Sequence, residues 1–293
     1  MSDPVIFFLI QVLNAVQYGL LLFLVASGLT LIFGIMGIIN LAHGSFYMLG
    51  AYLAFVCADA TGSFWLALVI AVPLSFGFGL LLETLLFRFL YARDHLYQVL
   101  LTYGLILVFE EGRGLLVGND VHGVPVPALL NSSIPLTATL SYPAYRLALS
   151  AICLVVAGLL YLLIQKTRLG MAIRAGSVNR EMVQSLGIDI GMVYRVVFAI
   201  GVTLAAFAGM LAAPTTSVFP GMGNQVLIVC FVTVVIGGIG SIKGAFLGAM
   251  LIGLVDTFGA VYAPQISGML VYMLMAAVLI WRPAGLFGRA ATR

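Results

Sequence analysis

The sequence predicts an all-α polytopic membrane protein, and two observations carry that prediction. Of the 293 residues, 63% are hydrophobic and only 8% are charged, and the mean hydropathy is +1.19. A soluble domain carries about 25% charged residues, so this chain has too few polar side chains to cover a water-exposed globule. Residues 4–58 and 196–242 contain no Asp, Glu, Lys or Arg. This composition excludes a water-soluble enzyme, a nucleic-acid-binding protein and a disordered chain.

The apolar stretches divide into membrane-spanning helices. One helix needs about 20 apolar residues to cross the hydrocarbon core, so each charge-free stretch holds two or more crossings. A transmembrane β-barrel would show alternating segments of roughly 10 residues, and the continuous apolar run 147–164 is incompatible with it. We therefore predict a single transmembrane domain, residues 1–293, with about nine (8–10) helices, some of them broken. They fall near 5–33, 41–58, 64–87, 96–117, 145–165, 192–213, 225–241, 244–261 and 266–282.

The first block, residues 5–60, has two interpretations. Gly28, Gly34, Gly37 and Asn40 interrupt its apolar run and could each break a helix. Two crossings would place the N-terminus outside and give nine spans. Three short crossings would place it inside and give ten.

The basic residues predict the orientation. Cytoplasmic loops of membrane proteins are rich in Lys and Arg. The segmentation puts eleven of the 13 basic residues on one side, and the loop 114–145 on the other side has none. The eleven are Arg88, Arg93, Lys166, Arg168, Arg174, Arg180, Arg195, Lys243, Arg282, Arg289 and Arg293. We therefore expect the loop 166–195 and the C-terminus to be cytoplasmic.

The loop 166–191 is predicted to hold a short amphipathic helix beyond the membrane. Ser177 is a suitable N-cap and Gly187 a suitable C′ residue. Between them, one face carries Val178, Met182, Val183 and Leu186, and the other carries Asn179, Arg180, Glu181 and Gln184. Such a helix either lies on lipid headgroups or docks another protein.

Three motifs together resemble one family. The loop sequence RAGSVNREMVQSLGIDIGMVYRVVFAIG resembles the coupling loop of the branched-chain amino acid permeases of ABC importers. GLTLIFGIMGIINLAHGSFYMLGAYLAF, residues 28–55, is similar to the N-terminal signature of that family, and VVIGGIGSIKGAFLGAMLIG, residues 234–253, to its C-terminal one. Importers of this family contain two dissimilar permease subunits, and the chain resembles the shorter of the two. The resemblance assigns ATPase coupling to Arg174, Ala175, Ser177, Val178, Asn179, Arg180, Glu181, Met182, Val183, Leu186 and Gly187.

The resemblance also implies partners and a location. They are a second permease subunit, two ATPase subunits that bind ATP and Mg, and a periplasmic solute-binding protein, in a bacterial inner membrane. No cofactor is expected in this chain itself, because neither Lys166 nor Lys243 follows a glycine as a Walker A lysine would. The implied solute is a branched-chain or other neutral amino acid, with urea or a short amide as the alternative.

Two short segments are candidates for the solute path. Asn40, His43, Gly44 and Ser45 are polar or small residues that follow the expected helix break, where the start of a half-helix could meet a solute carboxylate. The alternative, an ordinary helix cap near the cytoplasmic interface, is the favoured interpretation, because helix ends need caps in any case. Gly237 and Gly240, with Gly238 between them, faintly repeat the spacing of Gly34 and Gly37. Matching broken helices of an internal repeat would give this pattern, and so would the chance recurrence of glycines in membrane helices.

Other classes of protein fit less well. A stand-alone secondary transporter or channel would not need the long basic loop, and a proton-coupled one would need an ionisable residue deep in the bilayer. An intramembrane enzyme would need a nucleophile beside a base, and the sequence predicts no catalytic residue. His43, His95 and His122 are too scattered in the sequence for a metal site.

Overall fold

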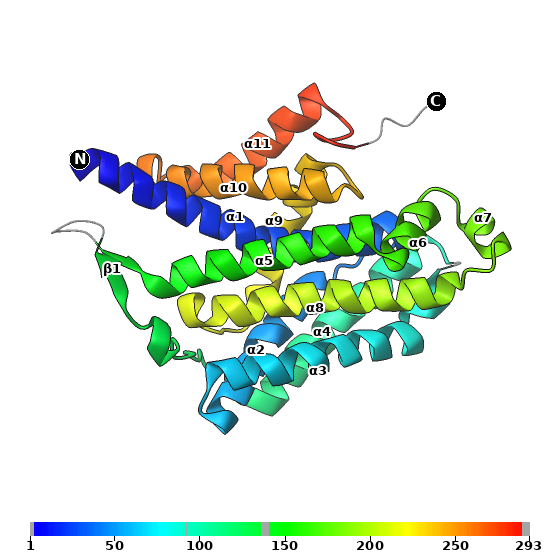
Figure 1. The fold of residues 1–293 in the computed structure, drawn as a ribbon, viewed down its shortest axis with the longest axis horizontal. Helices are drawn as coiled ribbons and strands as arrows, with labels where there is room; N and C mark the ends of the chain where they lie inside the picture. The colour runs from blue at the N-terminus through cyan, green and yellow to red at the C-terminus, as the bar shows by residue number, and fades with distance from the viewer. Residues whose placement is uncertain (1–2, 92, 136–140, 289–293) are drawn as a thin grey trace.

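The computed structural model describes residues 3–91, 93–135 and 141–288 as a helical bundle (Figure 1). Its helices are α1 (Asp3–Met36), α2 (His43–Thr61), α3 (Phe64–Leu85), α4 (His95–Val117), α5 (Ala144–Lys166), α6 (Arg168–Gly176), α7 (Arg180–Ser185), α8 (Ile190–Thr216), α9 (Met222–Gly237), α10 (Ile242–Tyr262) and α11 (Ser267–Trp281). Short 3₁₀ turns, η1 (Phe87–Leu90) and η2 (Ala128–Leu130), and an antiparallel pair, β1 (Ser133–Pro135) and β2 (Ser141–Pro143), lie in the loops. The predicted all-α class is confirmed.

In the described part of the chain, five helices are long and apolar enough to cross a membrane by length and composition: 5–36 of α1, and α3, α5, α8 and α10. Within the described residues, α2, α4, α9 and α11 coincide with the other four predicted segments. Helix α4 carries Glu110, Glu111 and Arg113, and α9 and α11 have only 16 and 15 residues. The total of nine crossings therefore stays a prediction.

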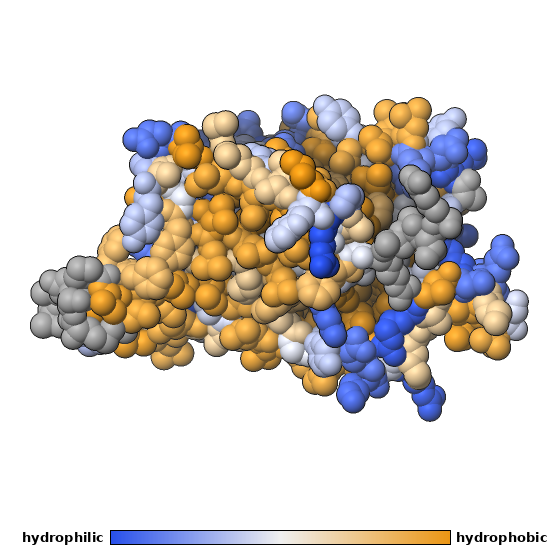
Figure 2. Space-filling view, turned by 90° about the horizontal axis from the view of Figure 1, so that it is seen from above, coloured by the Kyte–Doolittle hydropathy of each residue, from blue (hydrophilic) through white to orange (hydrophobic). Residues whose placement is uncertain are grey.

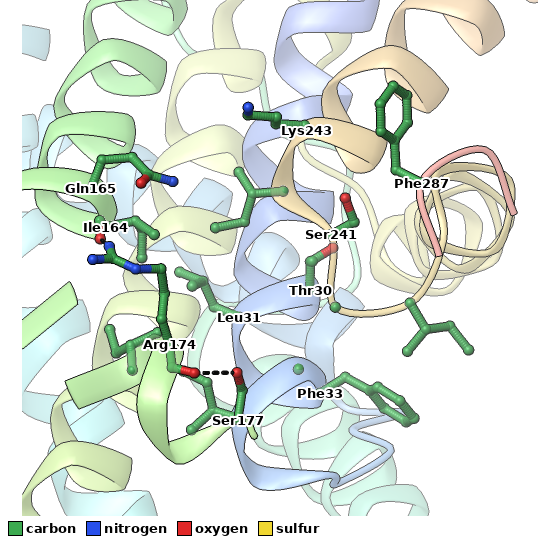
Figure 3. A pocket seen from close by; sticks show the side chains of 16 residues that line it. Thr30, Leu31, Phe33, Ile164, Gln165, Arg174, Ser177, Ser241, Lys243 and Phe287 are labelled. Carbon is green, nitrogen blue, oxygen red and sulfur yellow. Dashed lines mark hydrogen bonds between the residues drawn. The ribbon is translucent and has the colours of Figure 1, made fainter. Parts of the chain in front are cut away.

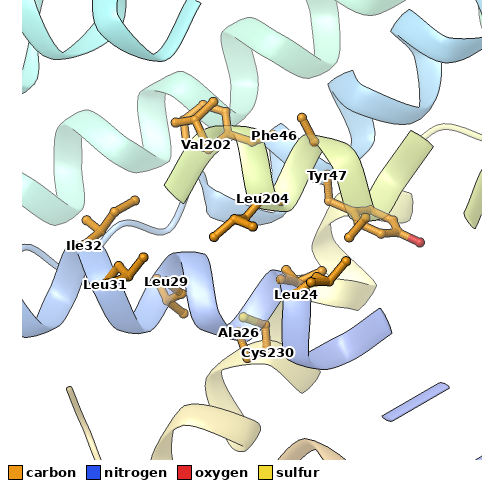
Figure 4. Packing of buried hydrophobic residues seen from close by; sticks show 14 of the residues in the cluster. Leu24, Ala26, Leu29, Leu31, Ile32, Phe46, Tyr47, Val202, Leu204 and Cys230 are labelled. Atoms are coloured by element: carbon orange, nitrogen blue, oxygen red, sulfur yellow. The ribbon is translucent and has the colours of Figure 1, made fainter. Parts of the chain in front are cut away.

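Helices α1 and α8 form the centre of the bundle, and α2, α3 and α10 pack around them. Figure 4 shows this core, in which Leu24 and Leu29 of α1 lie near Leu204 of α8 and Cys230 of α9. The helices approach closely at positions where the residue is glycine and no side chain separates the two backbones. A Cβ added to Gly28 would collide with the Gly201 carbonyl of α8, and one added to Gly209 with the Tyr47 carbonyl of α2. This is the packing that small residues allow between membrane helices.

Helix α2 begins deep inside the bundle. Gly28 and Gly34 do not break α1, which continues to Met36, so the alternative of three short helices is wrong for this block. The chain leaves the helix at Gly37 with φ of +67° and stays non-helical to residue 42. His43, the first residue of α2, places its Nε2 2.9 Å from the Val25 carbonyl oxygen. Val25 lies eleven residues before Met36, which is roughly 16 Å along the helix axis.

The two ends of the bundle differ. Helices α6 and α7 lie at one end and the β1–β2 pair at the other (Figure 1). The loop after α3 belongs to the α6–α7 end, because the ring of Tyr91 contacts that of Tyr194 near the start of α8, at 5.0 Å between centroids. Figure 2 shows apolar side chains over most of the middle of one face, as contact with lipid requires.

Candidate docking and transport sites

Helices α6 and α7 are fixed by caps that their own sequence supplies. The Thr167 hydroxyl accepts a hydrogen bond from Gly170 N at 3.0 Å and starts α6, and the Asn179 side chain accepts one from Met182 N at 3.0 Å and starts α7. The prediction of Ser177 as the N-cap is therefore wrong. Ser177 ends α6, and its hydroxyl donates to the Arg174 carbonyl at 2.9 Å. Asn caps as well as Ser does, so α7 starts later and is only six residues long.

Helix α7 presents a small apolar surface to the outside. The side chains of Val178, Met182 and Leu186 are 68%, 64% and 75% exposed, and together they form what we call the docking surface. Val183 was predicted to lie on the same face, but it is only 3% exposed and packs into the chain's own core. Gly187 has φ of +81° and follows the helix, which confirms it as the C′ residue.

The guanidinium of Arg180 reaches back to the bundle, although the residue as a whole is exposed. Its guanidinium donates hydrogen bonds to the carbonyl oxygens of Ile35 and Met36 at 3.2 and 3.0 Å, and it lies 5.6 Å over the Tyr194 ring. The last carbonyls of a helix have no partner within that helix. Arg180 therefore caps α1 and joins α7 to the start of the non-helical segment 37–42. We call this contact the Arg180 link.

A buried carboxylate lies at the same end of the bundle. Glu83 is almost fully buried, Arg195 Nε lies 3.3 Å from its Oε2, and the Tyr91 hydroxyl donates to its Oε1. Burial, together with the neighbouring Glu83, raises the pKa of Tyr91 and keeps its hydroxyl protonated. This is the only ion pair within the residues that the structure describes. The positive charge of Arg195 therefore balances the negative charge of Glu83, and the ion pair ties α3 to α8.

A cavity of about 230 Å³ lies between α1, α2 and α9, and we call it the central cavity. Tyr18, Tyr47 and Gln225 supply its polar groups, and its other lining residues are Leu21, Leu22, Val25, Val226 and Val229. At about 30 Å³ per water, it has room for a small solute. None of the lining residues in the described part of the chain is charged. The sequence prediction missed it, although a tyrosine or glutamine inside an apolar helix is a usable signal.

The first turns of two helices flank the central cavity. Tyr47 belongs to the first turns of α2 and Gln225 to the first turn of α9, and the backbones of Gly44 and Gly223 meet between them. A Cβ at either glycine would collide with the carbonyl of the other. Helix N-termini carry a partial positive charge, so two of them converge beside this cavity.

The predicted path residues occupy several places. Asn40 and His43 are fully buried but do not line the central cavity; the Asn40 side chain accepts from Ala42 N at 3.1 Å. Ser45 is also buried away from the cavity. Gly237 packs on Gly244, and Gly238, with φ of +96°, packs on the backbone near Gly288. Gly240 lines a separate cavity beside α6 and α10.

Potential metal ligands are dispersed. Across residues 3–91, 93–135 and 141–288, no three His, Cys, Asp or Glu side chains come together as a metal site. Cys57, Cys153 and Cys230 are free thiols.

An apolar helical bundle with a small cavity between three helices and a pair of short helices at one end has the parts that a membrane transport subunit needs. The chain belongs to the family described as the permease component of branched-chain amino acid transport systems, which it matches over residues 11–279.

Named relatives match this chain over most of its length. The high-affinity branched-chain amino acid transport permease BraD of Pseudomonas aeruginosa is 30% identical over 96% of both chains. Its counterpart LivH of Escherichia coli K12 is 29% identical over 99% of this chain and 98% of its own. The permease LivM of the same organism is 28% identical over 88% of this chain and 66% of its own. No solved structure matches the chain.

Proposed function

We propose that this chain is one permease subunit of an ATP-driven importer for branched-chain or other neutral amino acids in a bacterial inner membrane. The observation that carries the proposal is the match to LivH-like permeases over nearly the whole chain. The central cavity supports the class of solute. Its wall is mostly aliphatic with three polar groups and no fixed charge, which suits an apolar side chain on a zwitterion without net charge.

The proposed partners follow from the relatives and the surface. Two different E. coli permeases, LivH and LivM, match this chain, which supports pairing with a second, homologous permease. The docking surface of Val178, Met182 and Leu186 is where an ATPase subunit would bind, with ATP and Mg held in the ATPases. A solute-binding protein would deliver its cargo at the opposite end, beside β1 and β2.

The proposed mechanism is alternating access driven from α7. Closure of the ATPases displaces α7, and the Arg180 link transmits that displacement to the end of α1 and to residues 37–42. These residues lead into α2, whose Tyr47 lines the central cavity. The contacts thus form a continuous route from the docking surface to the cavity.

Reconstitution tests the proposal. In proteoliposomes, the purified chain alone should not accumulate leucine, with ATP or with a proton or sodium gradient. Adding the ATPases, the second permease and the binding protein of the same importer should give ATP-dependent accumulation. Urea and a short amide, offered in parallel, should not be accumulated. Uptake by the chain alone under an ion gradient would contradict the proposal.

The orientation is predicted by the basic residues. Reporter fusions after Lys166 and after Gly288 should report the cytoplasm, and a fusion after Pro127 the outside, because Lys and Arg are retained on the cytoplasmic side. A cytoplasmic signal at Pro127 would reverse the orientation and remove the docking surface from the ATPases.

Blocking the central cavity should stop solute movement. Val226→Trp places a large ring in a space of about 230 Å³, and we expect at least a tenfold loss of uptake in the reconstituted complex with normal ATPase binding. Ile228→Trp is the matched control, because Ile228 lies two residues on in α9, is exposed and does not line the cavity. Equal uptake by the two variants would place the solute path elsewhere.

A further inference from the structure

A second cavity, of about 500 Å³, opens at the α6–α7 end of the bundle (Figure 3). The ends of α1 and α5, helix α6 and the start of α10 all contribute to its lining. The central cavity shares no residue with it and uses other positions of α1. The lining of the second cavity includes Arg174 and Ser177 of the predicted coupling residues and Gly240 of the predicted path, but the cavity lies apart from both the docking surface and the central cavity.

The polar lining of this cavity is suited to an anion. Arg174 and Lys243 approach it from α6 and α10, and none of its described lining residues is acidic. Arg174 donates one hydrogen bond to the Ile164 carbonyl, and Lys243 has no carboxylate partner in the part of the chain that the structure describes. Ser241, at the N-cap of α10, accepts from Gly244 N at 3.1 Å, which leaves its hydroxyl proton free to donate.

Thr30 gives an independent indication of a ligand. A threonine inside a helix usually bonds back to a carbonyl one turn earlier, as Thr203 does to Ala199 at 2.7 Å and Thr233 to Val229 at 2.7 Å. The Thr30 hydroxyl has no such partner although Thr30 is only 1% exposed, and the residue lines the cavity beside Ser241 (Figure 3). An unpaired buried hydroxyl is costly, and an anion in the cavity would satisfy it.

The rest of the lining is apolar, which favours a lipid over a free ion. Leu31, Ile164, Ile173 and Ile239 form walls beside the polar groups. The cavity lies at the flank of α5 and α10, two membrane-span candidates with largely exposed surfaces. Basic pockets between helices on the cytoplasmic side of a membrane bind anionic lipid headgroups.

We propose that this cavity holds the phosphate headgroup of an anionic phospholipid of the cytoplasmic leaflet, bound by Lys243, Arg174, Thr30 and Ser241. The glycerol and upper acyl region lie against the isoleucine and leucine walls. The choice of leaflet rests on the orientation in the proposed function, whereas the binding itself does not. A lipid held there bridges α1, α6 and α10 next to the docking surface.

Native mass spectrometry of the full-length chain tests this proposal. The purified chain in a neutral detergent is given phosphatidylglycerol or phosphatidylcholine, and the bound lipid is counted. We expect phosphatidylglycerol to bind preferentially, Lys243→Gln to weaken it about fivefold, and Lys243→Arg to restore it. Thr30→Val, which keeps the side-chain shape, should weaken it several-fold. Arg168→Gln removes an exposed charge from the same end outside the cavity, and Thr203→Val removes a satisfied hydroxyl. Both should bind as wild type.

Three results would overturn the proposal. They are equal binding of the two lipids, undiminished phosphatidylglycerol binding by Lys243→Gln and Thr30→Val, and displacement of the lipid by millimolar inorganic phosphate, which would assign the cavity to a free anion. Thermal unfolding of each variant shows whether a loss of binding comes from misfolding. If Lys243→Gln is misfolded, Lys243→Arg provides the test, because it keeps the positive charge and should bind phosphatidylglycerol as the wild type does. The lipid-binding experiment measures neither ATP hydrolysis nor transport, so a negative result does not contradict the importer proposal. A failure of reconstituted uptake likewise does not affect the interpretation of lipid binding.

Discussion

Met182→Asp is expected to insert normally and to lose the ATPase subunits during purification of the complex. Met182 is the middle residue of the docking surface and is 64% exposed in the isolated chain. In the complex the new carboxylate would be buried without a partner, which costs several kcal/mol, whereas truncating a central interface side chain costs more than about 1 kcal/mol. Binding-protein-stimulated ATP hydrolysis and uptake should fall at least tenfold, as measured by co-purification and in proteoliposomes.

The control for this variant lies on the same helix. Gln184→Asp introduces the same charge two residues away on an exposed polar position of α7, and it should retain the ATPases. Asn179→Ala removes the N-cap of α7, worth about 1 kcal/mol, and should have an intermediate effect. If α7 lies on lipid instead of an ATPase, Met182→Asp would keep normal ATPase association and stimulated hydrolysis.

Arg180→Met should separate ATPase binding from transport. The variant keeps the bulk of the side chain but removes both hydrogen bonds to the α1 carbonyls and the contact of the charge with Tyr194. Hydrogen bonds from a charged group are worth about 1.5–3 kcal/mol each. We expect the ATPases to co-purify at wild-type levels, while stimulation of hydrolysis by the loaded binding protein and uptake of leucine both fall at least tenfold.

Two comparisons make the role of Arg180 specific. Arg180→Lys keeps a donor and should recover part of the stimulation, and Glu181→Gln changes the neighbouring exposed charge and should behave as wild type. Stimulated hydrolysis and uptake at wild-type levels in Arg180→Met would show that the Arg180 link does not transmit motion. If Arg180→Met instead failed to co-purify with the ATPases, Arg180 would be assigned a role in ATPase binding.

The helices were predictable because long apolar runs determine them almost alone. The ends of α4 and α5 lie within one residue of the predicted segments. Gly28 and Gly34 were misjudged as breaks, because their lack of a side chain serves the approach of α1 to α8 and to Gly240. Helix propensity cannot distinguish a glycine that packs a helix from one that ends it, whereas Gly37 ends α1 through its positive φ.

The sites were less predictable because they depend on contacts between distant segments. Periodicity put Val183 on the docking face, but it lies about 100° around α7 from Met182, and in the structure that side of α7 is buried against the chain's own core. Arg180 looked like a solvent-facing charge, and only the tertiary structure brings it to carbonyls about 145 residues earlier. The central cavity combines Tyr18, Tyr47 and Gln225 from three helices, and no local pattern in the sequence joins them.

The deep start of α2 constrains how the chain is made. Backbone without internal hydrogen bonds cannot remain in hydrocarbon unless protein surrounds it. Residues 37–42 follow the end of α1, which Arg180 caps, and lead into α2, which packs on α8. Arg180 and α8 emerge from the ribosome about 140 residues after this segment or later. At 5–20 residues per second that interval lasts on the order of ten seconds. During it, α1 can already cross the bilayer, but α2 must wait near the surface. The first helical pair of this protein is therefore completed only after the second half of the chain has been synthesised.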